Sequence, residues 1–163
     1  MKRKSFARMP CSVARALEVV GDGWTLLVVR DLFYGASRFD ELLEYTGIAR
    51  NILTSRLNKL VADGIVEKRD NPEGGKRKIY CLTEKVQDLF TILIALMQWG
   101  DRWEADAAGP TLSMLDQSSG DPIPDIFVRN TEGDVVGSRD VLLRPGPGAT
   151  RAVLKRFSGA TRG

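Results

Sequence analysis

The sequence contains no histidine and only two cysteines, Cys11 and Cys81. The lack of histidine excludes imidazole acid–base catalysis, histidine-based pH sensing and zinc sites that need a histidine ligand. Two cysteines are too few for a disulfide framework or a structural zinc site, so we expect no metal and no cofactor. No nucleotide-binding loop and no nucleophile–base pair is visible, and an enzyme is not expected.

Long apolar runs are also missing. No stretch approaches the roughly 18 apolar residues of a transmembrane helix, and no signal-peptide core follows the basic N-terminus. We therefore expect a cytoplasmic protein that does not interact with membranes. At 163 residues and 43% hydrophobic content, the chain can bury a real core and suits one domain with an appendage.

The net charge of +3 is small, but the charges are unevenly distributed. Residues 1–10 carry four cations and no acid, which indicates a basic N-terminal arm. Residues 68–78 carry five cations against two acids, whereas residues 105–163 hold seven of each sign. The basic excess therefore lies in two short segments, 1–10 and 68–78, and not in the last third of the chain.

Residues 47–82 give the strongest signal. Leu53, Leu57, Leu60 and Val61 recur at helical spacing after Gly47 and predict one buried stripe, ending at Gly64. Strand-like runs at 65–66 and 79–82 flank turn residues 71–75 and a basic loop. A helix followed by a basic hairpin predicts a winged helix-turn-helix, although a merely solvated polar face is an open alternative.

The polar side chains opposite that stripe are of the kinds that contact base edges or the DNA backbone. Ile52 lies at the edge of this arc, and Arg38 precedes it on the helix before. The predicted DNA-contacting residues are Arg38, Arg50, Asn51, Ser55, Arg56, Asn58 and Lys59 on the helices, and Lys76, Arg77 and Lys78 on the wing.

Three helices are predicted before this one. Residues 12–20 place Val13, Ala16, Leu17 and Val20 on one face, and residues 24–33 are apolar enough to be mostly buried. Residues 38–45 form a short helix that Ser37 is predicted to cap.

A long helix is expected from Thr83, as its cap, to about Ala107. It has more apolar faces than a surface helix of a monomer needs, so we expect it to pack on a partner subunit as well; full burial within a monomer is the alternative. A two-fold dimer also suits a palindromic operator. The predicted dimer-interface residues are Phe90, Leu93, Ile94, Met97 and Trp99.

The segment from Cys11 to Trp99 resembles the HxlR-type winged-helix transcription regulators, relatives of the MarR group. The order and spacing of many short matches carry the resemblance. These are Cys11, Val13, Ala16-Leu17, Gly21, Trp24, Leu32 to Gly35, Arg38-Phe39, Glu41-Leu42, Ile48, Leu53, Arg56-Leu57, Leu60, Asp63-Gly64, Tyr80 to Thr83 and Trp99-Gly100. The resemblance implies a homodimeric regulator whose helix after Gly47 enters the major groove, with the loop 74–78 as the wing.

The chain departs from the family pattern at three positions. Ser12 stands where the family usually has proline, Gly23 where it has lysine, and Val86 where it often has glycine. Gly23 removes one phosphate contact, and none of the three touches the polar arc.

The resemblance also raises two questions of control. Some family members use a cysteine near Cys11 to sense oxidants, and a cysteine at a helix start beside Arg8 and Arg15 suits that chemistry; a cysteine without a role is the favoured alternative. Trp24, Trp99 and Trp103 line a small-molecule effector pocket on one interpretation and pack in the core on the other, which we favour. Cys81 is expected to face outward if Tyr80 and Leu82 face inward.

The residues from 108 onward are not covered by the resemblance. Residues 125–129 and 135–136 flank a turn at 130–134 and predict a β-hairpin. Residues 141–143 are a candidate third strand, and residues 151–157 a short basic helix or a disordered tail.

Together these observations predict an α+β, mainly α, fold: a winged helix-turn-helix with a long C-terminal dimerisation helix and a small β appendage. The predicted parts are a basic arm (1–10), a DNA-binding and dimerisation domain (11–107) and the appendage and tail (108–163). The predicted function is a homodimeric, sequence-specific regulator of transcription on a palindromic operator in double-stranded DNA, with a repressor favoured and an activator as the open alternative. Control by a small molecule and control by cysteine oxidation both stay open. The alternative function is a winged-helix protein-interaction module.

Overall fold

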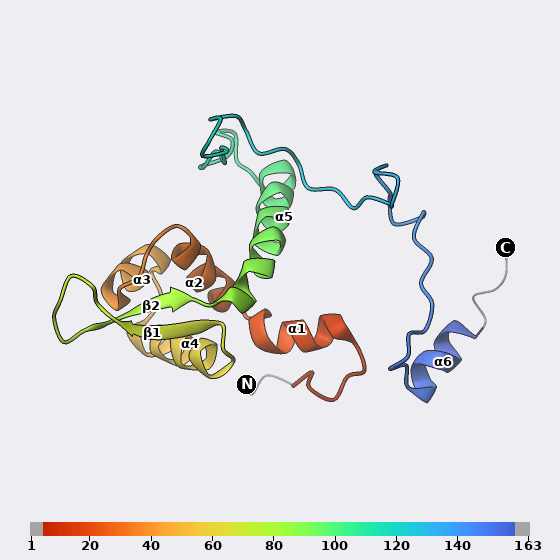
Figure 1. Cartoon of the computed structure of the whole chain (residues 1–163), viewed down its shortest axis with the longest axis horizontal. Helices are drawn as coiled ribbons and strands as arrows, with labels where there is room; N and C mark the ends of the chain where they lie inside the picture. The colour runs from red at the N-terminus through yellow and green to blue at the C-terminus, as the bar shows by residue number, and fades with distance from the viewer. Residues whose placement is uncertain (1–4, 159–163) are drawn as a thin grey trace. The chain divides into compact units, whose positions relative to one another are not determined.

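A computed structural model describes residues 5–158, which form mostly helices and one small antiparallel sheet (Figure 1). In chain order the elements are α1 (Ser12–Val20), α2 (Gly23–Phe33), α3 (Phe39–Thr46), α4 (Arg50–Ala62), β1 (Val66–Asp70), β2 (Lys78–Leu82), a 3₁₀ turn η1 (Glu84–Val86), α5 (Gln87–Trp103) and α6 (Arg151–Phe157). The order of α2, α3, α4, hairpin and long helix is that of a winged helix-turn-helix, as the sequence predicts.

The chain divides into two units. One is Val19–Ile126, which holds α2 to α5 and the sheet. The other joins the chain before Val19 to the chain after Ile126.

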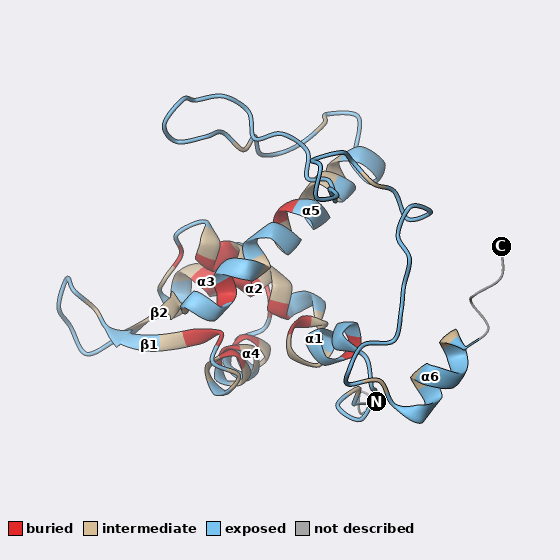
Figure 2. Cartoon of the chain, turned by 45° about the vertical axis from the view of Figure 1, so that its right-hand side comes forward, coloured by how far each residue is buried: buried red, intermediate tan, exposed pale blue. Residues whose placement is uncertain are grey.

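The core of the first unit lies where α2, α3 and α4 meet β1 and η1, shown by the buried segments in Figure 2. α4 contributes Leu53, Leu57 and Leu60, each at most 1% exposed, so the predicted buried stripe is confirmed apart from half-buried Val61. Fully burying a leucine side chain contributes about 1.5–3 kcal/mol. This stripe therefore fixes which face of α4 points away from the protein.

Two glycines set the path of the chain around α4. Gly47, at φ +65°, ends α3 and donates its N–H to the Leu43 carbonyl at 3.1 Å. Gly64, at φ +68°, follows the last turn of α4, and Ile65 then donates to the Leu60 carbonyl at 2.9 Å. Both positions need a left-handed backbone that glycine adopts without strain.

The hairpin is longer than the sequence predicts. Val66 pairs with Leu82 at its base and Asp70 with Lys78 at its outer end. β1 packs on α4 and β2 on α2. Within β1 only Val66 is buried, and the remaining residues 67–70 are all charged. A search for alternating hydrophobic residues therefore does not detect the full length of this strand.

The helix after the hairpin differs from the prediction at both ends. Thr83 does not cap it: the Thr83 hydroxyl donates to the Gly64 carbonyl at 2.7 Å, and η1 intervenes before α5. α5 ends at Trp103 and does not continue to Ala107. A threonine hydroxyl that is already bound to the hairpin base is not available to the helix start.

α1 has the predicted bounds, but only part of its apolar face is buried. Val20 is buried as one of the four residues of that face, whereas Val13 and Leu17 are 65% and 42% exposed, and Ala14, outside that face, is buried as well. The expected basic arm lies mostly outside the described residues, since Lys2, Arg3 and Lys4 are not described; Arg8 is exposed.

The appendage forms less sheet than expected. The turn at 130–134 is present, held by the Asn130 side chain, which accepts the Glu132 and Asp134 N–H groups at 3.0 and 2.8 Å. Only the single bridge Arg129–Val135 follows it, and no strand forms at 141–143. The apolar side chains here are exposed, so they bury too little surface to stabilise a hairpin. The basic helix is confirmed as α6.

Candidate nucleic-acid interface

The outward face of α4 presents the predicted polar arc. Asn51, Ser55 and Asn58 are exposed, on the side opposite the buried leucines. Arg50, in the first turn, is also exposed, and its guanidinium lies over the Phe39 ring of α3. Amide and hydroxyl groups on an exposed helix face are suited to hydrogen bonding with base edges in a major groove.

The cations at the edge of this arc are already paired. The Arg56 Nε lies 3.1 Å from Asp22 Oδ1, and both side chains are mostly buried. Lys59 is half-buried and pairs with Asp63 one turn along α4. Ile52 is half-buried and packs against the core. Arg56 is therefore part of the fold as well as of the surface.

The wing is the loop between β1 and β2. Gly74 and Gly75 have φ of +86° and +102°, which lets the loop turn sharply, and the Gly74 N–H donates to the Asn71 carbonyl at 2.9 Å. Lys76, Arg77 and Lys78 follow, all exposed. An open groove of about 900 Å³ separates this loop from α3 and the start of α4. It is lined by cations from all three elements, among them Arg38, Arg50, Lys68 and the three wing residues.

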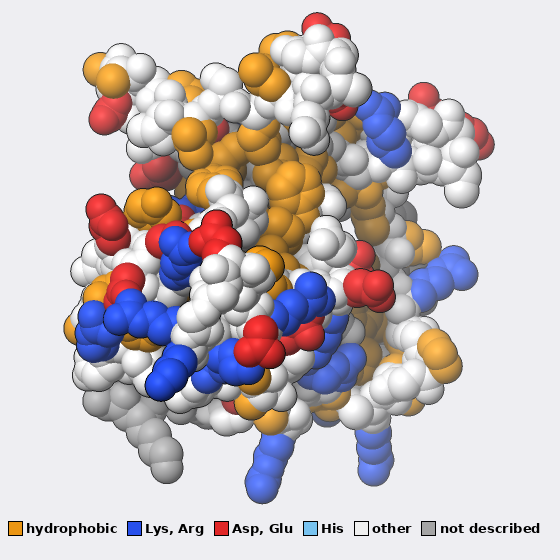
Figure 3. All heavy atoms as spheres, turned by 60° about the vertical axis from the view of Figure 1, so that its left-hand side comes forward, with side chains coloured by type: hydrophobic (Ala, Val, Ile, Leu, Met, Phe, Trp, Pro, Cys, Tyr) orange, Lys and Arg blue, Asp and Glu red, His pale blue; other side chains and the backbone are white. Residues whose placement is uncertain are grey.

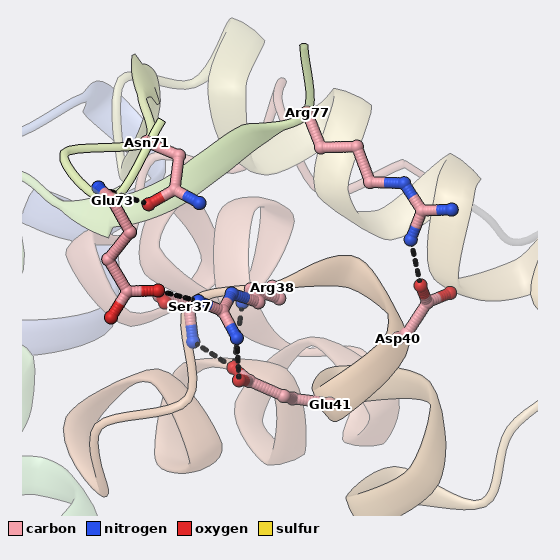
Figure 4. Close-up of polar contacts among 7 residues, drawn as sticks. All are labelled: Ser37, Arg38, Asp40, Glu41, Asn71, Glu73 and Arg77. Atoms are coloured by element: carbon pink, nitrogen blue, oxygen red, sulfur yellow. Dashed lines mark hydrogen bonds and ion pairs between the residues drawn. The ribbon is translucent and has the colours of Figure 1, made fainter. Parts of the chain in front are cut away.

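Ion pairs between acidic and basic side chains span this groove, as the close-up in Figure 4 shows. Asp40 of α3 accepts a hydrogen bond from Arg77 at 2.8 Å and lies 3.6 Å from Arg50. Arg38 pairs with Glu73 of the wing. Neither acid is predicted from the sequence to belong to the site, because their partners Arg38 and Arg77 are 35 and 37 residues away along the chain.

Glu41 orders the start of α3. Its carboxylate accepts the N–H groups of Ser37 and Arg38, both at 2.9 Å. These two hydrogen bonds, with the nearby Arg38 charge, hold the pKa of Glu41 below its usual value. Ser37 is therefore not the cap that the sequence suggests, since Arg38 occupies that position and Glu41 satisfies the free N–H groups.

Charges of both signs alternate over the face drawn in Figure 3, where Lys and Arg side chains are interleaved with Asp and Glu. Lys78 likewise pairs with Asp70, its partner across the hairpin, at 2.6 Å. Of the three wing cations, Lys76 is the one without an ion pair to a described residue. The surface is thus a set of cations held by acids, and not an unbroken basic patch.

The predicted dimer-interface residues of α5 fall into two groups. Ile94 is buried, and Leu93 and Met97 are half-buried against α2. Phe90 also faces α2, with its ring centre 5.2 Å from that of Phe33, although it is 47% exposed. Trp99, on the opposite side of the helix, is 54% exposed, and Ile92 and Leu96 add further exposed apolar surface. α5 therefore uses one side for its own domain and leaves a second apolar side uncovered by the described residues.

Comparison with known proteins identifies the family. The HxlR-like helix-turn-helix family profile matches residues 19–108, more than half of the chain. The chain belongs to the HxlR-like helix-turn-helix family.

Several relatives extend this assignment. An HTH-type transcriptional regulator of Mycobacterium tuberculosis is 38% identical over 84% of the HxlR-like chain and 87% of its own length. The crystal structure of PA1607, described as a transcription factor, superposes with a TM-score of 0.82 at 36% identity, over 88% of this chain and all of that one. The redox regulator HypR, in its reduced form, matches at a TM-score of 0.51 and 30% identity, over 56% of this chain and 92% of its own.

These comparisons make the HxlR-like chain a transcriptional regulator with a helix-turn-helix domain and not an enzyme. Within residues 5–158 no group of three or more His, Cys, Asp or Glu side chains is placed to hold a metal ion. Over the same residues, no helix combines the length and apolar character needed to cross a bilayer. The similarity to PA1607 and to the mycobacterial regulator extends beyond the family profile into the other parts of the chain.

The cysteines and tryptophans of the HxlR-like chain lie near its surface. Cys11 is exposed and Cys81 half-buried, and both are free thiols. Trp24, Trp99 and Trp103 are 40%, 54% and 68% exposed in the single chain, so the expectation that they pack in its core is wrong. They do not line the apolar cavity of about 190 Å³ between α2 and α5 either.

Proposed function

We propose that this regulator binds duplex DNA sequence-specifically and acts as a homodimeric repressor on a palindromic operator. The observation that carries the proposal is the exposed polar arc of α4 beside a groove rimmed by Arg38, Arg50 and the wing cations. Three of the arc's side chains, Asn51, Ser55 and Asn58, carry neutral groups that form directional hydrogen bonds, as base reading requires.

The proposed contacts divide by chemistry. Asn51, Ser55 and Asn58 read base edges from α4. The cations contact phosphates and set the register on the duplex: Arg38, Arg50 and Lys59 from the helices, and Lys76, Arg77 and Lys78 from the wing. Arg56 lies at the edge of the interface with its guanidinium directed to Asp22.

The uncovered side of α5 supports the homodimer. Trp99 exposes a large apolar surface there, together with Ile92 and Leu96. Leu93, Ile94 and Met97 face α2 on the other side of the helix, and so does Phe90, which packs on Phe33 but stays 47% exposed at the edge. A two-fold pair of α4 helices spaced by about one helical turn of DNA, roughly 34–36 Å, would read a palindrome. A dimer seated on such a site near a promoter represses by occupying the DNA.

Two routes of control are proposed for test. Cys11 is a free and exposed thiol, and the similar protein HypR is a redox regulator, which together support oxidation. The apolar cavity between α2 and α5 supports a small apolar effector instead.

Selection from a random duplex library with the purified full-length protein tests the proposal. We expect enrichment of a palindromic motif, a mass of two chains by analytical ultracentrifugation, and affinity that falls steeply as salt rises. A folded dimer that enriches no sequence, whether reduced or oxidised, contradicts the proposal and favours a protein-interaction module. Selection performed in both redox states also tests Cys11.

A further inference from the structure

One carboxylate connects the three elements that line the groove. Asp40, in the first turn of α3, accepts a hydrogen bond from Arg77 of the wing at 2.8 Å, and its other oxygen lies 3.6 Å from Arg50, the first residue of α4. Arg50 also stacks over the Phe39 ring, with its guanidinium carbon 5.0 Å from the ring centre. Both arginines are therefore held on the α3 side of the groove.

These ion pairs contribute little to the stability of the fold. The side chains of Asp40, Arg50 and Arg77 are 59%, 65% and 91% exposed. Water screens such pairs, and exposed ion pairs typically contribute between 0 and about 1 kcal/mol. Fold stability is therefore a weak explanation for an acid in the middle of a cationic groove.

We expect Asp40 to affect the affinity of the groove for DNA phosphates more than it affects the stability of the fold. A phosphate that approaches Arg50 or Arg77 meets a guanidinium that is already paired and a carboxylate of its own sign. We infer that Asp40 is a specificity-determining residue, which lowers affinity for random DNA by competing with phosphates for Arg50 and Arg77. The inference rests on the proposed DNA-binding function.

Random and operator DNA both meet this competition at Arg50 and Arg77. On random DNA nothing offsets it, because non-specific affinity comes almost entirely from phosphate contacts. On the operator, Asn51, Ser55 and Asn58 fix a single register, in which a pre-ordered wing offsets part of the loss. The wing is also tied to α3 by two crossed ion pairs, Asp40 with Arg77 and Arg38 with Glu73 (Figure 4). A wing that is already held in place loses less freedom when it docks on the operator.

The test compares wild type, Asp40→Asn and Asp121→Asn on the selected operator and on a random duplex, each over about 50–300 mM salt. Asp121→Asn makes the same change in net charge, at an exposed carboxylate with no hydrogen bond or ion pair to the described residues. For Asp40→Asn we expect random-duplex affinity to rise by about 5–10-fold near 0.1 M salt, and the salt slope to steepen by about 0.9, the equivalent of one phosphate. Operator affinity should rise less than about 3-fold, and Asp121→Asn should behave as wild type.

Other results overturn the inference. Equal behaviour of Asp40→Asn and Asp121→Asn removes any role for Asp40, and equal gains on both duplexes remove its role in specificity. A loss of operator affinity alone would make Asp40 a direct operator contact. If the wild type binds neither duplex at low salt, the proposed DNA-binding function has failed first, and the inference fails with it.

Discussion

Arg56 of α4 and Asp22 at the start of α2 form an ion pair, with 3.1 Å between Nε and Oδ1 and side chains only 27% and 23% exposed. The Arg56 N–H is not aligned with the oxygen for a hydrogen bond, so the link is electrostatic. It fixes the middle of α4 to the start of α2. A residue that the sequence assigns to DNA contact thereby also stabilises the fold.

Replacing Arg56 by alanine should lower the free energy of unfolding by about 1–3 kcal/mol, because it leaves the Asp22 charge mostly buried and unpaired. Urea unfolding followed by circular dichroism measures the loss. Arg50→Ala, at an exposed position of the same helix, is the control and should change stability by less than about 0.5 kcal/mol. Equal effects of the two variants would show that the Asp22 pair does not stabilise the protein.

Base reading and phosphate binding should separate by mutation. Arg77→Ala should weaken binding to all duplexes and reduce the salt slope by about 0.9, since it removes one phosphate contact. Asn51→Ala should instead alter base preference at one position, at about 1–3 kcal/mol of discrimination. Titrations on the operator and its single-base variants distinguish the two. Arg144→Ala, an exposed arginine in the appendage, is the matched control; an Arg77→Ala variant indistinguishable from it would exclude the wing from the interface.

Stability should depend on pH through Glu41. Hydrogen bonds from Ser37 and Arg38 lower the pKa of this carboxyl in the folded state. Its contribution is therefore complete above the unfolded carboxyl pKa of about 4.3 and is lost as pH falls through the lower folded pKa. Glu41→Gln should be less stable than wild type at pH 7, and the difference should shrink between about pH 5 and pH 3. Glu44→Gln, at an exposed position of the same helix, is the control; a pH-independent difference for Glu41→Gln would reject the assignment.

The uncovered side of α5 should be required for dimerisation. Trp99→Glu places a charge in the proposed interface and should give a folded monomer, because burying an unpaired carboxylate opposes association. Sedimentation measures the mass and circular dichroism the fold. Leu142→Glu changes an equally exposed apolar residue of the appendage and should leave the dimer intact. A Trp99→Glu variant that remains dimeric would move the interface elsewhere.

Periodicity predicted the helical part of the fold well. The leucine stripe of α4 and the glycines on either side of it depend on local spacing and backbone conformation, which the sequence displays directly. α1 shows the limit of this reasoning: its bounds were right, but which of its faces is buried depends on neighbouring segments, and Val13 and Leu17 proved to be exposed.

The electrostatics of the site were less accessible. A local sequence window shows Arg77 and Asp40 separately, and only the path of the hairpin brings them within 2.8 Å. The same applies to Thr83, whose position before a helical pattern indicates a cap, although its hydroxyl binds the carbonyl of Gly64, 19 residues earlier. Long-range partners of this kind follow from topology and leave no pattern in composition or spacing.

The Thr83 contact also has a mechanical consequence. Thr83 binds the Gly64 carbonyl, and Lys85 binds the Asp63 carbonyl at 2.7 Å, so the chain entering α5 is fastened directly to the chain leaving α4. The two helices thus share a common joint, and Val86, between this joint and α5, is buried in the core with the leucines of α4. A force applied along the long helix would change the angle at which α4 presents its outer face.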